Sequence, residues 1–283
     1  MTTSPPPPGP PTGGSPFTTA GSTAAPAATD AGEARGRDTG DQGTGQAVSW
    51  PAPPLEPGRP PQQVLENLWL FAPNRDSQGG SAWWLEAVGV DLLIDLPALT
   101  AANLAFLQER RRGRQAPVWV VATGREGHGR ARAWQGELGW PVMVQEQEAY
   151  LLPGLADLHT FASEHDLAPG VRLLWTPGPS PGACVLHAAA PALPSQDLLF
   201  CGRLLVPLGP GQLGPLRSSR CFHWSRWLRS LDRLRQWLPP GSPALLASGA
   251  GLGALRGEKL VADGAALLGG LDLMALATRE PGG

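Results

Sequence analysis

The sequence has few of the features that mark secreted or membrane proteins. Only three of its 283 residues are cysteine, and Cys184, Cys201 and Cys221 lack the spacing of a metal knuckle or a disulfide framework. No apolar run approaches the roughly 18 residues that a membrane span needs. The first residues carry neither the basic nor the apolar segment of a secretory signal. We therefore expect a cytoplasmic protein that does not enter a membrane.

The chain also lacks an excess of charge of either sign. Its net charge is −2, whereas nucleic-acid-binding domains usually present a basic face, so we expect no nucleic-acid partner. The arginine cluster at residues 110–114 is interpreted as a solvated helix end or loop. A hydrophobic content of 42% fits one globular domain with additional sequence.

Residues 1–61 are rich in Pro, Gly, Thr, Ala and Ser and contain almost no large apolar side chains. Such a segment cannot bury enough surface to offset the entropy lost on ordering. We therefore expect a disordered tail over residues 1–61 and one folded domain over residues 62–283. The segment Pro5 to Pro11 could form a polyproline II strip that docks a protein partner. An unstructured extension is the alternative.

Apolar runs bounded by turn residues predict strands, and three- and four-residue periodicity predicts helices. Strands are expected at 64–71, 81–86, 90–95, 118–122, 142–144, 171–175, 183–188, 197–201 and 244–247. Helices are expected at 101–111 with Thr100 as its cap, at 130–138, at 224–238 and at 257–278. Strands come in runs separated by helices, which favours two sheets with outer helices over an alternating doubly wound sheet.

Five short segments carry motifs in a fixed order. They are L-L-I-D at 92–95, V-A-T-G-R-E-G-H-G at 121–129, W-T-P-G-P-S-P-G at 175–182, L-F-C-G-R-L-L at 199–205 and A-S-G-A-G at 247–251. In this order they resemble the metallo-β-lactamase fold over roughly residues 63 to 270. The resemblance implies an α/β (α+β) domain built as a four-layer αββα sandwich, on a scaffold that belongs to a hydrolase superfamily.

The resemblance also implies where metal ligands are expected. Members of this superfamily hold one or two metal ions with His and Asp side chains on these loops, and the metal activates a water molecule. Here Gly124 and Pro179 stand where two of the histidines are expected, Arg203 stands at the bridging aspartate, and Ala250 stands at the late histidine. Asp95 is retained, but in the family it supports the site from behind.

Two acceptable alignments of the first loop leave only Glu126 and His128 able to contact a metal or to act in catalysis. A catalytic zinc site generally needs three protein ligands. An arginine about 4 Å from a divalent ion would also be repelled by about 8 kcal/mol at an effective dielectric constant near 20. We therefore expect no metal cofactor and no metal-dependent catalysis. The alternative is a zinc- or iron-dependent hydrolase of thioesters, esters or phosphodiesters with a non-standard ligand set.

The loops that have lost ligands contain arginines instead. Arg125, Arg203 and Arg75 are predicted to bind a small anionic ligand, because guanidinium groups suit carboxylate and phosphate. The alternative is that Arg203 pairs with Glu126 or Asp95 and replaces the metal as an internal salt bridge. The favoured function is a pseudoenzyme that binds a ligand or partner on a hydrolase fold.

Overall fold

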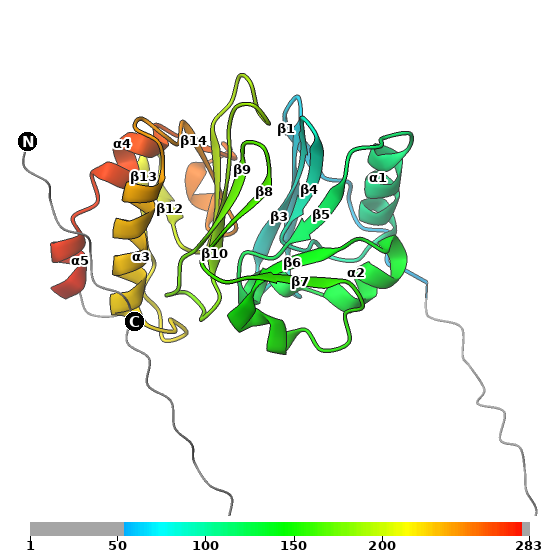
Figure 1. Ribbon diagram of the computed structural model, residues 1–283, viewed down its shortest axis with the longest axis horizontal. Helices are drawn as coiled ribbons and strands as arrows, with labels where there is room; N and C mark the ends of the chain where they lie inside the picture. Colours follow the sequence, from blue (N-terminus) through cyan, green and yellow to red (C-terminus); the bar gives the residue numbers. More distant parts are fainter. Residues whose placement is uncertain (1–53, 279–283) are drawn as a thin grey trace, which may run out of the picture. The chain divides into compact units, whose positions relative to one another are not determined.

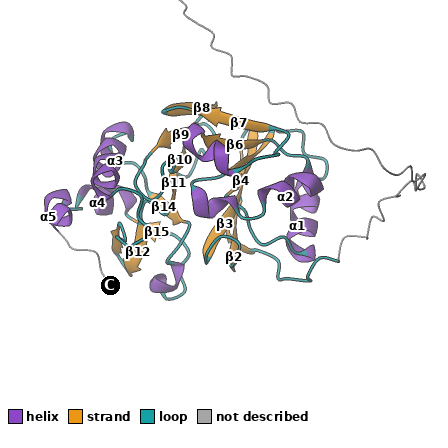
Figure 2. Ribbon diagram, turned by 90° about the horizontal axis from the view of Figure 1, so that it is seen from below, coloured by secondary structure: helices purple, strands orange, loops and turns teal. Residues whose placement is uncertain are grey.

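The computed structural model describes residues 54–278, so most of the predicted tail and residues 279–283 lie outside the described part. Two sheets face each other, and helices cover the outer face of each (Figure 1). Figure 2 shows α1 and α2 on one side of the pair of sheets and α3, α4 and α5 on the other. The layers therefore follow the predicted αββα order.

The first sheet has seven strands in chain order, antiparallel from β1 to β4 and parallel from β4 to β7. They are β1 (Gln62–Leu65), β2 (Leu68–Asn74), β3 (Gly80–Ala87), β4 (Val90–Ile94), β5 (Val118–Val121), β6 (Val142–Gln145) and β7 (Leu158–Phe161). The single strand predicted over 64–71 was wrong. A turn at Glu66 and Asn67 divides it, and β1 pairs back on β2.

The second sheet has the order β15-β14-β11-β10-β9-β8, with β11 and β14 parallel. Its strands are β8 (Glu164–Ala168), β9 (Val171–Trp175), β10 (Cys184–Ala188), β11 (Leu198–Gly202), β14 (Leu245–Ser248) and β15 (Val261–Ala262). A separate hairpin of β12 (Val206–Gly209) and β13 (Gln212–Gly214) follows β11. This hairpin was not predicted.

The helices are α1 (Ala101–Arg111), α2 (Ala131–Leu138), α3 (Trp224–Trp237), α4 (Gly264–Gly269) and α5 (Leu273–Thr278), with 3₁₀ turns η1 (Arg125–His128), η2 (Glu146–Leu151) and η3 (Leu252–Leu255). Thr100 caps α1 as predicted, because its side chain accepts a hydrogen bond from the Asn103 amide. The continuous helix predicted over 257–278 was wrong. It contains β15 and two short helices, which Gly269 and Gly270 help to separate because glycine disfavours a helix interior.

Three apolar clusters hold the layers together: one between the sheets and one under each set of helices. Trp83 belongs to the central cluster and meets Phe200 across the sheets, with ring centroids 6.2 Å apart. Trp84, on the opposite face of β3, packs under α1 and α2. Both tryptophans are at most 1% exposed, so neither is available to an interface.

The arginine cluster lies at the end of α1, as predicted, but most of its side chains are paired and only partly exposed. Arg110 forms an ion pair with Glu86, and both Arg111 and Arg114 pair with the fully buried carboxylate of Asp91. These pairs tie α1 to β3 and β4.

Residues 54–61 form no helix or strand, yet they contact the domain. The amides of Ala101 and Ala102 donate to the carbonyls of Glu56 and Pro57, 2.8 and 2.9 Å away. No helix between residues 54 and 278 has the length and apolar character needed to cross a membrane.

Candidate ligand site

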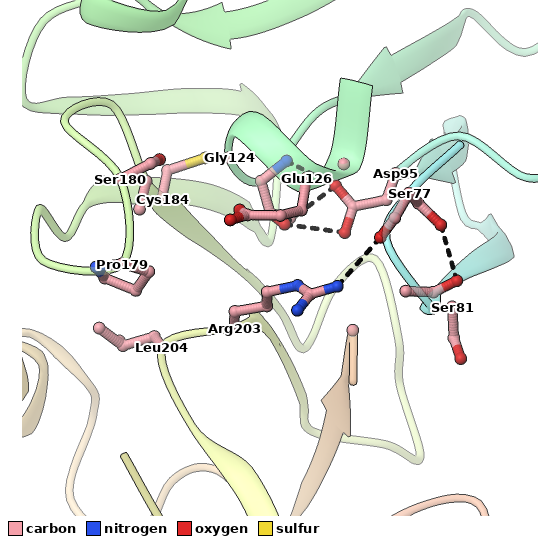
Figure 3. Close-up of a pocket in the computed structure, with 15 residues that line it drawn as sticks. Ser77, Ser81, Asp95, Gly124, Glu126, Pro179, Ser180, Cys184, Arg203 and Leu204 are labelled. Carbon is pink, nitrogen blue, oxygen red and sulfur yellow. Dashed lines mark hydrogen bonds between the residues drawn. The ribbon is translucent and has the colours of Figure 1, made fainter. Parts of the chain in front are cut away.

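The loops that follow β4, β5, β9, β11 and β14 meet around a small cavity of about 20 Å³. Asp95, Gly124, Glu126, Pro179, Ser180 and Arg203 are among its lining residues (Figure 3). A cavity of this size holds about one water molecule. The segments that carry the sequence motifs are therefore brought together in space.

The positions that lost metal ligands also converge. Gly124, Pro179 and Arg203 line the cavity, and Ala250 lines the larger pocket beside it, together with Pro179 and Arg203. Three of the four side chains offer no metal donor, and the fourth is a cation. Within residues 54–278 no group of three or more His, Cys, Asp or Glu side chains is placed to hold a metal ion. The donor set does not fit a metal at this place.

Arg203 is placed by the turn that ends β11. Gly202 has a φ of +51°, and a Cβ there would lie 2.4 Å from the Thr123 side-chain oxygen, so this position suits only glycine. Arg203 Nη2 donates to the carbonyl oxygen of Ser77 at 3.0 Å (Figure 3). The same nitrogen donates to the carbonyl oxygen of Gln78 at 2.9 Å. Within the described residues its Nε and Nη1 form no hydrogen bond, and the guanidinium forms no ion pair with Glu126 or Asp95. The direct salt bridge considered as an alternative is therefore not formed.

Asp95 lies behind the cavity in a strained conformation. Its φ is +57°, uncommon for a residue with a side chain. Its carboxylate accepts hydrogen bonds from the Thr123 amide at 2.7 Å and the Thr123 hydroxyl at 2.9 and 2.8 Å. Burial raises the pKa of Asp95 from 3.8 to about 6, against the opposing effect of Thr123 and Arg203. A Cβ at Gly127 would lie 2.0 Å from Asp95 Oδ1, so the carboxylate occupies space that a side chain at 127 would need.

The Pro/Gly loop is held by a buried carboxylate that the sequence did not identify. Glu148 is fully buried, and its Oε1 accepts hydrogen bonds from the Ser180 hydroxyl at 2.5 Å and the Gly182 amide at 2.9 Å. Burial raises the pKa of Glu148 despite these two donors. Glu148 was not among the predicted site residues, because a single sequence does not distinguish a buried carboxylate from a solvated one.

His128 faces Glu148 and not the cavity. Its Nε2 lies 3.7 Å from Glu148 Oε2, and neither buried atom has a hydrogen-bond partner among the described residues. Burial, with a smaller effect of Arg125, lowers the pKa of His128 from 6.5 to about 4, so the ring is neutral at pH 7. Glu126, the other weak candidate for catalysis, does line the cavity. The two candidates therefore do not face one shared space.

A second pocket of about 440 Å³ adjoins the cavity and shares Glu126, Pro179 and Arg203 with it. Most of its wall is apolar and comes from the β12–β13 hairpin, residues 216–221, α3 and η3. Such a volume is in the range of small-molecule sites. Arg220 also lines it and donates from Nη1 to Gln78 Oε1 at 2.6 Å.

Of the three arginines predicted to bind an anion, the structure brings one to the pocket. Arg125 is exposed and donates to the Tyr150 hydroxyl at 3.3 Å, and Arg75 is exposed in the β2–β3 turn. Neither lines the cavity or the pocket. Arg220 does, and sequence reasoning missed it because residues 217–221 match none of the five motifs.

The sequence matches no protein-family model and no curated protein. Solved structures do resemble it. A metallo-β-lactamase from Pontibacter korlensis has a TM-score of 0.54 and 20% identity, covering 77% of this chain and 99% of that chain. The DIM-1 metallo-β-lactamase has a TM-score of 0.54 and 17% identity, and the match covers 79% of this chain and 97% of that chain. A B3 metallo-β-lactamase with an active-site glutamic acid has a TM-score of 0.51 and 18% identity, and the match covers 80% of this chain and 94% of that chain. The chain therefore has the metallo-β-lactamase fold that its motifs predicted.

Proposed function

We propose that this chain uses its metallo-β-lactamase fold to bind a small anionic ligand at Arg203, and that it does not hydrolyse the ligand through a bound metal. The observation that carries the proposal is the hydrogen bonding of the Arg203 side chain. One nitrogen is anchored on two backbone carbonyls, while the other two nitrogens have no hydrogen-bond partner among the described residues. The side chain lines both the cavity and the 440 Å³ pocket.

An anchored guanidinium with free donors is well suited to an anion. Both two-donor edges of a guanidinium include Nη2, which the Ser77 and Gln78 carbonyls already occupy. An anion would therefore be held by single charge-assisted hydrogen bonds from Nε or Nη1, which are shorter and stronger than neutral ones. Because the Ser77 and Gln78 carbonyls already fix one end of the group, less side-chain entropy is lost when a ligand binds. The same charge disfavours a metal ion, since an arginine and a divalent ion about 4 Å apart repel by about 8 kcal/mol at an effective dielectric constant near 20.

The lack of metal-ligating side chains at the cavity also supports binding without metal-dependent hydrolysis. Metal-dependent hydrolysis needs an ion that lowers the pKa of a bound water molecule. Gly124, Pro179 and Ala250 have no side-chain atom that could ligate such an ion, and Arg203 repels it. The two remaining donors, Glu126 and His128, face different spaces. These residues support binding without metal chemistry.

Two measurements on the purified full chain test the proposal. We expect elemental analysis to find no stoichiometric zinc or iron. We also expect acetate, succinate or phosphate to raise the melting temperature of the wild type, and Arg203→Ala to abolish the shift. An anion at about 100 times its Kd stabilises by about 2.7 kcal/mol, which corresponds to roughly 5 to 10 °C for a domain of this size.

Arg75→Ala is the matched control, because Arg75 is exposed in the turn next to Gln78 but lines neither space. This variant should keep the full anion-dependent shift. Stoichiometric metal, whose removal by a chelator abolishes an esterase activity, would overturn the proposal and favour the metal-dependent hydrolase. A broad panel of anions that leaves the melting temperature unchanged would also contradict it.

A further inference from the structure

We infer that the ligand is an aliphatic monocarboxylate: an anionic head group at Arg203 with an unbranched hydrocarbon chain in the 440 Å³ pocket. This inference rests on the proposed function and specifies the chemical class of the ligand. It combines three observations on the pocket, namely where its charges lie, what its walls are made of, and how much space it encloses.

The charged groups of the pocket are linked through one residue. Gln78 accepts a hydrogen bond from Arg203 on its backbone oxygen at 2.9 Å and another from Arg220 on its side-chain oxygen at 2.6 Å. Glu126 is the one acidic residue among the lining residues and forms no ion pair within the described part of the chain. Two guanidinium groups and one carboxylate leave a formal charge of +1, which matches a ligand with a single negative charge.

Apart from Gln78 and Ser218, the rest of the wall is mainly apolar. Val206, Leu208, Leu216, Trp227 and Ala254 are among its residues, contributed by the hairpin, the following loop, α3 and η3. The indole nitrogen of Trp227 is already used, since it donates to the Leu204 carbonyl at 2.8 Å. This wall therefore offers a ligand mainly apolar contact area, and a polar chain such as a sugar would find few hydrogen-bond partners along it.

Two of these apolar side chains lie largely in solvent. Leu208 is 47% exposed and Leu216 is 59% exposed. Neighbouring exposed leucines at a pocket often mark a binding site, because covering them removes apolar surface from water. A hydrocarbon chain along this wall would cover both, whereas a short anion held at Arg203 would leave them in water.

The available space sets the size of the ligand. A pocket of about 440 Å³ is in the range of small-molecule sites, so it has room for a hydrocarbon chain beside the head group. The 20 Å³ cavity beyond Arg203 admits about one water molecule. The head group therefore stays at Arg203, and the chain occupies the larger pocket.

Isothermal titration of the full chain with decanoate, below its critical micelle concentration, tests the inference. Acetate and phosphate supply the charge without the chain, and methyl decanoate supplies the chain without the charge. We expect decanoate to bind at least about tenfold more tightly than any of the three, because only decanoate uses both parts of the site. Leu216→Ser should weaken decanoate by roughly tenfold and leave acetate unchanged.

The matched control is Val88→Ser, at an apolar residue that is 63% exposed on the β3–β4 turn, away from the pocket. It should bind decanoate like the wild type. Acetate or phosphate binding as tightly as decanoate, with dependence on Arg203, would overturn this inference and leave the proposed function intact. Decanoate binding that responds equally to Leu216→Ser and Val88→Ser would overturn it as well. Binding of none of these anions would refute both proposals.

Discussion

Replacing Asp95 with asparagine should stabilise the protein at neutral pH. Asp95 is buried, and its pKa rises from 3.8 to about 6 on folding. Asparagine has the same shape and imitates the protonated carboxyl group. It also tolerates the positive φ of this position better than most residues. Its amide can keep hydrogen bonds with the Thr123 amide and hydroxyl, so little packing changes.

The size of the effect follows from the difference between the two pKa values. A shift from 3.8 to about 6 is about two units, and each unit corresponds to about 1.4 kcal/mol. Because the folded pKa is raised, the folded state binds the proton more tightly. The stability contributed by the protonated form is fully present below about pH 4 and is lost as pH rises through about 6. Above that pH the asparagine variant should be more stable by about 3 kcal/mol.

The assay is urea unfolding of both proteins at several pH values between 4 and 8. The free-energy difference between variant and wild type should grow from near zero at pH 4 to about 3 kcal/mol at pH 8, with most of the change between pH 4 and 6. Asp91→Asn is the control: its buried carboxylate pairs with Arg111 and Arg114, so this variant should lose stability at neutral pH. A difference for Asp95→Asn that does not depend on pH, or a loss of stability at pH 8, would refute the reasoning.

Three further predictions concern the loops around the cavity. Glu148→Ala should lower the free energy of unfolding by about 2 to 5 kcal/mol in urea, because two buried donors lose their acceptor. Glu148→Gln should recover most of this loss. Equal losses in the two variants would contradict the hydrogen-bond explanation. Gly127→Ala should destabilise, since a Cβ there overlaps the Asp95 carboxylate, whereas Gly136→Ala, in an open helix position, should stabilise by about 0.5 to 1 kcal/mol. A thiol reagent should modify half-buried Cys221 before the two buried cysteines, and decanoate should slow this reaction because Cys221 lines the pocket; mass spectrometry of the labelled peptides checks both points.

The sequence predicted the fold well where a motif or periodicity reports directly on the backbone. The strand at 118–121 and the helix with Trp224 as its first residue follow from local apolar patterns. The capping role of Thr100 depends only on residues next to it in the chain. The tail boundary stays a prediction, since residues 1–53 lie outside the described part.

The errors arose where the structure depends on partners that are distant in sequence. The strand β1 exists because it pairs with β2, and the short β7 and β8 depend on neighbours in their sheets in the same way. Glu148 accepts hydrogen bonds from the loop at 180–182, which lies more than 30 residues away in the sequence. Arg220 reaches the pocket through Gln78, in a turn far away in the chain. No local pattern encodes these contacts.

The anchoring of Arg203 has a consequence for the mechanics of the whole sandwich. Ser77 and Gln78 belong to the turn between β2 and β3 of the first sheet, whereas Arg203 follows β11 of the second. A ligand on Arg203 would therefore bind where the two sheets meet. At the same place the Ser81 amide of the first sheet donates to the carbonyl of Gly249, which follows β14 of the second sheet. A ligand that needs Arg203 held by this turn would stabilise the folded state in which the two sheets are in contact. The bound molecule would act as a removable link between the two sheets.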